Sequence, residues 1–430
     1  MMMVDRSDVL VIGGGPGGST IAALLAQRGE NVVLVEKDTH PRFHIGESLL
    51  PLNVPLLEEL GVKMAVDRIG MPKFGVEFVS PWHENVSQQL DFAEAWDKSL
   101  SSAYEVRRSE FDDLLFKNAA ARGASVIEGC RISRVEFPPE GGVVATGQDS
   151  DGQERRFEAK FLVDASGRDT LVAGQLATKE RNPRHATAAV YGHYAGAWRR
   201  PDKAAGNITL FWFDHGWFWY IPLLDGTTSV GAVCSAAFMK ARGTDVTTFF
   251  HSLIAQCPPL AERLAGAQMT GPATATGNYS YRSTTMTGPN YILVGDAYAF
   301  IDPVFSSGVL LAMKSAFLGA DAVSAWLHGS RAEADRALQK FDTAVQRAID
   351  RFSWYIYRVN SRAMRDLFMR PGNPFRMREA VMSLLAGDVY GHSPIGLRLF
   401  LFKCVYYLKT LYLPREKKVA SWSAPGAGMT

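Results

Sequence analysis

The sequence predicts an α/β protein whose first domain contains a parallel sheet. Residues 8–12 form a short apolar run that ends in a glycine-rich turn at 13–18. A pattern of helical periodicity then continues to Gly29, and 32–35 form a second apolar run. A strand, a helix and a second strand in this order imply that the two strands are parallel.

The rest of the chain divides into two further parts. Aromatic-rich β-stretches cover about 75–105 and 186–233, and residues from about 309 onward are mainly helical. A first domain built from separated segments, with an inserted, mostly antiparallel β-sheet domain and a C-terminal helical region, explains this order. The expected boundaries are 1–74, 105–180 and 280–330 for the first domain, 75–104 and 181–279 for the inserted domain, 331–420 for the helical region and 421–430 for a disordered tail.

Composition excludes several classes of function. The chain is 47% hydrophobic and 21% charged, with a net charge of +2, which gives no general case for nucleic-acid binding. Its four cysteines are far apart and form no C-x-x-C pair, so we expect no metal site and a reducing, cytoplasmic environment. Asp5, Arg6 and Asp8 interrupt the start and argue against a signal peptide. Charges at three positions also divide the apolar stretch 397–413, which we interpret as an amphipathic helix, not a membrane span.

The glycine-rich turn predicts a dinucleotide site. Its spacing is Gly-x-Gly-x-x-Gly, between a strand and a helix, and Glu36 stands at the end of the next strand. Glycines at these places permit a tight turn and close approach of a pyrophosphate to the helix N-terminus, while Glu36 can accept hydrogen bonds from a ribose. The cofactor-binding residues predicted here are Gly13, Gly15, Pro16, Gly17, Gly18 and Glu36.

Three later segments favour FAD over NAD. Residues 162–168 and 293–297 both end buried strands and carry Asp164 and Asp296, while 106–112 contain Arg108. In this order they resemble segments of the flavin monooxygenase superfamily. The resemblance implies a Rossmann-like FAD-binding domain of the glutathione-reductase and p-hydroxybenzoate-hydroxylase type, with these three residues near the cofactor. Because only one dinucleotide fingerprint is present, reduced FAD is expected from a separate flavin reductase.

Two motifs narrow the activity. Lys73 lies in the apolar stretch 71–75, and the strand 217–222 has the complete pattern W-x-W-x-I-P. Alternation along that strand puts Trp217, Trp219 and Ile221 on one face, and Pro222 follows. These motifs resemble those of the flavin-dependent halogenases. The resemblance implies that Lys73 activates hypohalous acid between flavin and substrate, and that the tryptophan strand keeps an aromatic substrate away from the flavin ring.

A third motif lies just after Asp296, at 300–308, with the pattern F-x-x-P-x-x-S-x-G. By the same resemblance, Pro303 borders the flavin, and Ser307 and Gly308 hold the chloride or bromide. A helix cap at Ser307 is compatible with this role. The stretch 46–51 also resembles a family segment near the flavin, so Ser48 is a further candidate for cofactor contact, together with Glu47.

The substrate is less sharply defined. Tryptophan halogenases usually carry a glutamate where this chain has Phe305, so a phenolic or pyrrolic aromatic, either free or bound to a carrier protein, is expected. Residues 331–418 contain 17 Lys and Arg against eight Asp and Glu, an excess that suits an acidic carrier protein. An FAD-dependent aromatic hydroxylase or a geranylgeranyl-reductase-like enzyme is the alternative within the same fold. A catalytically silent flavin-binding protein is the alternative from another class.

Overall fold

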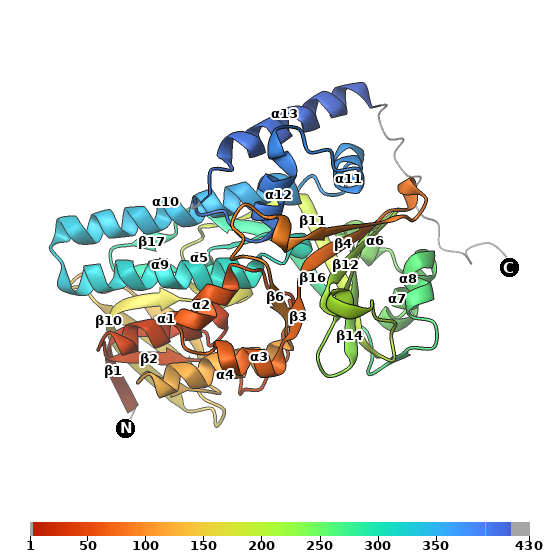
Figure 1. Cartoon of the computed structure of the whole chain (residues 1–430). Coiled ribbons are helices and arrows are strands. Elements are labelled where there is room, and N and C mark those ends of the chain that lie inside the picture. Colours follow the sequence, from red (N-terminus) through yellow and green to blue (C-terminus); the bar gives the residue numbers. More distant parts are fainter. Residues whose placement is uncertain (1–2, 392, 414–430) are drawn as a thin grey trace.

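The computed structural model describes residues 3–391 and 393–413. Two large sheets form its centre (Figure 1). In spatial order, the first sheet contains β17 Thr287–Gly288, β18 Tyr291–Leu293, β10 Glu154–Asp164, β1 Met3–Ile12, β2 Val32–Val35 and β7 Ser125–Ile127. All neighbours from β18 to β7 are parallel, as the strand–helix–strand pattern predicts. The strands β8 Arg131–Glu136 and β9 Val143–Gln148 pair with each other, and β9 also pairs antiparallel with β10.

Helices pack against this first sheet. In the buried half of β1, Val9, Leu10 and Val11 are all completely inaccessible to solvent, as expected for a parallel strand covered on both faces. The helix α1 Pro16–Gln27 packs against both α4 Arg108–Ala121 and α9 Gly308–His328. The start of α1 therefore faces the carboxyl ends of β1 and β2, where α/β proteins bind their ligands.

The second sheet is mostly antiparallel. In spatial order it contains β19 Ala299–Phe300, β16 Thr274–Ser283, β11 Lys179–Ala195, β14 Thr227–Ser235, β13 Gly216–Pro222, β12 Ile208–Phe213, β4 Gly75–Val79 and β5 Ser87–Asp91, with β15 Gln268–Met269 beside β11. Only β12 and β4 pair in parallel among these strands. The sheet includes residues 299–300, although we assigned 280–330 to the first domain, because the chain returns to pair with β16 before α9 begins.

Smaller elements complete the two domains. The second sheet carries α6 Ala236–Lys240, α7 Val246–Ala255 and α8 Pro258–Arg263 beside it. A separate two-stranded ladder joins β3 Met71–Lys73 to β6 Ala103–Glu105. The short helices α2 Asn53–Glu59, α3 Lys63–Ile69 and α5 Leu171–Gln175 belong to the first domain.

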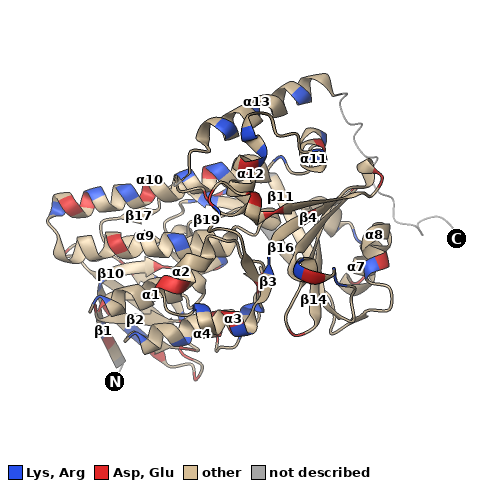
Figure 2. Cartoon of the chain, viewed as in Figure 1, with Lys and Arg blue, Asp and Glu red and all other residues tan. Residues whose placement is uncertain are grey.

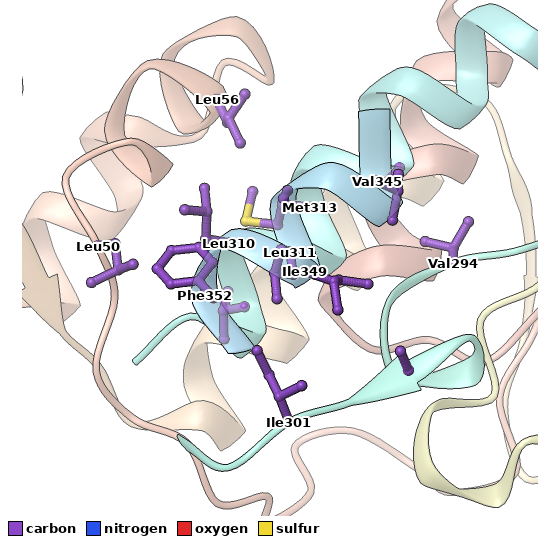
Figure 3. Close-up of a cluster of buried hydrophobic side chains, with 14 of the residues drawn as sticks. Leu50, Leu56, Val294, Ile301, Leu310, Leu311, Met313, Val345, Ile349 and Phe352 are labelled. Carbon is purple, nitrogen blue, oxygen red and sulfur yellow. The ribbon is translucent and has the colours of Figure 1, made fainter. Parts of the chain in front are cut away.

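The described chain is mainly helical from α9 onward, as predicted. After α9 come α10 Arg331–Ile356, α11 Arg362–Met369, α12 Met377–Leu385 and α13 Gly396–Tyr412. Leu310, Leu311 and Met313 of α9 meet Val345, Ile349 and Phe352 of α10 in a dry cluster (Figure 3). By length and composition α9 could cross a membrane, but 61% of its most apolar window is buried inside the protein, as in a core helix. The expected tail at 421–430 lies outside the described residues.

Candidate active site

A cavity of about 560 Å³ is lined by residues from both sheets and from α9. It extends from the carboxyl ends of β1 and β2 to one face of β13. Most of the residues predicted from the sequence line it: Gly13, Gly15, Pro16, Gly17, Glu36, Ser48, Arg108, Trp217, Trp219, Ile221, Asp296, Pro303 and Gly308. Five others do not, namely Gly18, Lys73, Asp164, Pro222 and Ser307.

The glycine turn is shaped by backbone contacts that exclude side chains. Gly13 has a φ of +103°, and a Cβ atom there would lie 2.3 Å from the carbonyl oxygen of Ala165. Gly18 does not face the cavity, but a Cβ atom at this position would lie 1.8 Å from the carbonyl oxygen of Gly13. These contacts direct the first N–H groups of α1, which have no partner within the helix, toward the cavity. A pyrophosphate binds well at a helix N-terminus of this kind.

Glu36 lies at the end of β2, and its carboxylate faces the glycine turn. It accepts a hydrogen bond from the backbone N–H of Gly14 at 2.6 Å and pairs with Arg42 at 3.2 Å. The backbone N–H of Asp38 donates to its other oxygen at 3.0 Å. The carboxylate is therefore fixed at the cavity wall, where a ribose hydroxyl would be within its reach.

Asp164 ends a buried strand, as predicted, but its carboxylate does not line the cavity. It ends β10 fully buried, and its two carboxylate oxygens accept hydrogen bonds from the backbone N–H groups of Ser166 at 2.9 Å and Val172 at 2.8 Å. With both oxygens used in this way, Asp164 shapes the turn that follows β10. Ala165 and Ser166 in that turn line the cavity instead.

Charged side chains surround the middle of the cavity. At the start of α4, the guanidinium of Arg108 donates to both carboxylate oxygens of Asp112, at 2.8 and 2.9 Å, and to the carbonyl oxygen of Ile45 at 3.2 Å. Burial raises the pKa of Asp296 to about 6, although the positive charges of Arg168 and Arg108 oppose the rise. A polar ligand in this part of the cavity would lie near the guanidinium groups of Arg108 and Arg168 and the carboxylate of Asp296.

The tryptophan strand forms an apolar wall, as its alternation predicted. Trp217, Trp219 and Ile221 face the cavity, while Phe218 and Tyr220 pack into the separate core on the other side of the sheet. The rings of the two tryptophans lie 6.1 Å apart, and the indole N–H of Trp219 donates to a serine hydroxyl of β14 at 3.1 Å. Pro222 ends the strand outside the cavity lining.

The loop before α9 presents two donors for an anion. Gly308 is the first residue of α9 and lines the cavity, so its backbone N–H belongs to the unpaired first turn of the helix. Ser307 is 1% exposed, and its hydroxyl is buried without a hydrogen-bond partner in the described part of the chain. An unsatisfied buried hydroxyl next to a helix N-terminus fits a halide.

Lys73 lies behind the cavity wall. Its side chain is buried, and its ammonium donates to the hydroxyl of Ser48 at 2.7 Å and to the carbonyl oxygen of Leu49 at 3.1 Å. Burial lowers the pKa of Lys73, and the negative charge of Glu105 partly opposes this. Since Ser48 does line the cavity, Lys73 is separated from it by this one side chain.

Several charged residues at the site were missed from the sequence, among them Arg42, Arg168 and Glu105. Arg168 lines the cavity close to Asp296, and Glu105 lies fully buried beside Lys73. The sequence did contain a signal for Glu105, because it is an acid within the otherwise uncharged stretch 99–106. Nothing in its local pattern indicated the buried lysine that it would meet.

Comparison with known proteins identifies the family. The family model described as tryptophan halogenase matches residues 8–98 and 83–366. A flavin-dependent halogenase of Armillaria mellea is 34% identical over 81% of this chain and 73% of its own length. The chain belongs to the flavin-dependent halogenases. A tryptophan 2-halogenase of Chondromyces crocatus is 39% identical over 76% of this chain, but the alignment spans only 63% of that relative.

One further relative and two solved structures are similar to this chain over most of its length. A 1H-pyrrole-2-carbonyl-[peptidyl-carrier protein] chlorinase of Pseudomonas fluorescens is 29% identical over 89% of both chains. The crystal structure of a flavoprotein/dehydrogenase from Cytophaga hutchinsonii has a TM-score of 0.86 at 26% identity, over 95% of this chain and 99% of its own. That of the myxobacterial chondrochloren halogenase CndH has a TM-score of 0.78 at 32% identity, over 96% and 99%. The predicted family, fold and FAD cofactor are thereby confirmed.

Proposed function

We propose that this protein uses reduced FAD, oxygen and chloride or bromide to form hypohalous acid, and that it passes the halogen through Lys73 to an electron-rich aromatic substrate. The proposal rests above all on Lys73 itself. A lysine that is 1% exposed is rare, and this one donates its hydrogen bonds at the back of the cavity wall. A buried ammonium is a strong hydrogen-bond donor to hypohalous acid, and the deprotonated amine could form a haloamine.

The residues that line the cavity indicate the direction in which FAD would lie, with its pyrophosphate at α1 and its flavin ring beside Pro303. The glycine turn at the start of α1 would hold the pyrophosphate, and Glu36 would hold the adenosine ribose. Arg108 and Asp296 would then lie along the ribityl chain, with Pro303 beside the flavin ring. Reduced FAD, when bound, would supply two electrons that reduce oxygen to the peroxide level, and oxygen at that level can oxidise the halide to hypohalous acid. We assign its reduction to a separate flavin reductase, since the sequence contains one dinucleotide fingerprint.

Two sets of residues direct that chemistry toward halogenation. Ser307 and Gly308 would hold the halide through a hydroxyl and a backbone N–H. Trp217 and Trp219 occupy the wall at which an aromatic substrate would otherwise reach the flavin. Lys73 lies buried on the other side of Ser48, so the hypohalous acid would meet the substrate away from the cofactor.

The proposed substrate is a phenol or a pyrrole. Phe305, in place of the glutamate typical of tryptophan halogenases, is buried and lies 6.0 Å from the ring of Phe368 in α11. A second ring contact, of 4.9 Å, joins Phe368 to Phe78 of the second sheet. These rings offer an apolar environment in place of a carboxylate that could pair with an amino group.

We further propose that the aromatic group is carried by an acidic carrier protein. Lysine and arginine positions are spread along α10 to α13 (Figure 2). Arg362 and Arg370, at the two ends of α11, are exposed. The helix α13 contains three basic residues and no acidic one, and it exposes Leu397 and Phe400. The Pseudomonas relative, a chlorinase named for a pyrrole group on a peptidyl-carrier protein, supports this choice.

Product analysis tests the proposed function. The protein is incubated with FAD, a flavin reductase, NADH, oxygen and either chloride or bromide, with a panel of phenols and carrier-bound aryl thioesters. Mass spectrometry should detect a halogenated product with its isotope pattern. Hydroxylated products alone would instead assign the chain to the aromatic hydroxylases. A parallel reaction without reductase should give no product, and turnover with NADPH alone would refute the need for a reductase.

A further inference from the structure

A pair of opposite charges is buried on the short ladder between β3 and β6. Met71 lies directly opposite Glu105 in this ladder, and Lys73 is two residues further along the same strand. Side chains two residues apart share one face of a strand, so Lys73 and Glu105 project to the same side. Their closest atoms, Nζ and Oε1, are 3.8 Å apart, and the two side chains are 2% and 0% exposed.

Glu105 depends on this lysine. Neither of its carboxylate oxygens has a hydrogen-bond partner among the residues that the structure describes. Two other groups face it: the hydroxyl of Ser48, which accepts a hydrogen bond from Lys73 and lowers the pKa of Glu105, and the carboxylate of Glu47, which raises it. Glu47 lies 2.9 Å from the imidazole Nε2 of His193. A buried carboxylate without hydrogen bonds is costly, so the lysine is its essential partner.

We propose that Glu105 is a positioning residue for Lys73, which holds the lysine beside Ser48 and sets its protonation state. This inference rests on the assignment of halogen transfer to Lys73. Glu105 need not touch the substrate, the halide or FAD. It acts through the lysine, and the lysine reaches the cavity through Ser48.

Burial shifts the pKa values of the two groups toward each other. It lowers the pKa of Lys73 and raises the pKa of Glu105, and in each case the charge of the partner works against the effect of burial. The two groups consequently compete for a single proton, either as an ammonium with a carboxylate or as an amine with a carboxylic acid. If the charge of Glu105 is removed, Lys73 loses the effect that raises its pKa and gives up its proton at lower pH.

The substitution Glu105→Gln tests this in the pH profile of halogenation. The limb of the profile that reports Lys73 should move to lower pH by about one unit or more, as expected when an opposite charge at this distance is removed. Glu105→Asp retains the charge and should keep the limb close to that of the wild type. If Glu105 had only a structural role, Glu105→Gln would lower the rate at every pH without moving the limb, and that result would overturn the proposal.

A second measurement does not depend on turnover. In protein labelled with ¹⁵N-lysine, the Lys73 signal is assigned by its loss in Lys73→Arg, and its titration is followed with FAD bound. The signal should titrate at lower pH in Glu105→Gln than in the wild type, and an equal pH in both would refute the pairing. If the glutamine variant does not fold, Glu105→Met removes the same charge with an apolar side chain of similar length. Normal halogenation by Lys73→Ala would defeat the proposed role of the lysine, whereas this titration would still test the pair.

Discussion

The two ends of the active site are built in different ways. At the nucleotide end, an open cavity is bounded by backbone: the glycine turn and the first N–H groups of α1. At the other end, Lys73 and Glu105 are enclosed side chains that lie behind the cavity wall. The nucleotide end is already formed for its ligand by local chain geometry. At the lysine end, the fold brings together two charged residues that are distant in the sequence, and the chemistry depends on the burial of their charges.

This difference has a consequence for mutations. Changes at the nucleotide end act by steric exclusion and should weaken the binding of FAD. Changes at the lysine end should leave FAD in place and remove a chemical step. Variants at each end therefore separate FAD binding from the chemical step.

Replacement of Lys73 by Ala should reduce halogenation by about a thousandfold or more, the scale on which essential donors and acid–base groups contribute. FAD binding and oxidation of the reduced flavin should stay within a factor of about two, because Lys73 does not line the large cavity. Product yield by mass spectrometry and FAD titration by fluorescence measure the two quantities. Lys63→Ala, at a partly exposed lysine paired with Asp67 on α3, is the matched control and should change neither. Normal product yield from Lys73→Ala would remove the lysine from the mechanism.

Replacement of Gly18 by Ala should act on the opposite end. The new methyl group would lie 1.8 Å from the carbonyl oxygen of Gly13, so the turn must shift. We expect FAD to bind at least about tenfold more weakly, which corresponds to 1.4 kcal/mol. The control is Gly174→Ala in α5, where a Cβ atom would meet no atom within 4 Å. Equal FAD affinity in the two variants would show that the close approach at Gly18 is not required.

The nucleotide end was also the part that could be predicted from the sequence in most detail. The glycine spacing and Glu36 follow from a strand–turn–helix unit that is local in the chain, and the alternation at 217–221 gave the correct face for both tryptophans. Residues near one another in sequence have their geometry fixed by backbone periodicity. The second sheet was predicted as mostly antiparallel for the same reason, since its aromatic strands follow one another along the chain.

Predictions that depended on distant contacts were less accurate. Asp164 looked like a cofactor residue, but its oxygens are taken by backbone N–H groups on both sides of the next turn. Glu105 was missed because its significance comes from Lys73, on another strand. Arg365 looked like a docking charge in the basic helical region, yet it is 5% exposed and its guanidinium lies 3.7 Å from the ring of Trp82. Burial of this kind is decided by tertiary packing.

Replacement of Ser307 by Ala should have a moderate effect, confined to the halide. The variant removes one buried hydroxyl that has no other partner in the described residues, and the backbone N–H of Gly308 remains. A hydrogen bond to a charged group contributes about 1.5–3 kcal/mol, so the KM for chloride or bromide should rise about 10- to 150-fold. FAD affinity should be unchanged. An unaltered halide KM would move the halide site away from this loop.

The smallest expected effect concerns the protein surface. It distinguishes a carrier-bound substrate, which needs a docking surface, from a free phenol. If an acidic carrier docks at α11 and α13, kcat/KM for the carrier-bound substrate should fall as salt rises beyond about 0.1 M, where the Debye length is about 10 Å. Charge reversal at Arg362 with Arg365, or at Lys417 with Lys418, is not a suitable test of this docking. Arg365 is buried against Trp82, and the two lysines lie outside the described residues.

Arg362→Glu with Arg370→Glu is therefore the better test, because both side chains are exposed at the ends of α11. Reversal should reduce kcat/KM for the carrier-bound substrate about three- to tenfold at low salt, mainly through the association rate. The matched control is Arg336→Glu with Lys340→Glu, in the first half of α10, whose N-terminal end lies far from α11 (Figure 1). A free phenol needs no docking surface, so its turnover should respond neither to salt nor to either pair. Equal efficiency for the free and carrier-bound forms of one aryl group, at every salt concentration, would leave the free phenol as the substrate.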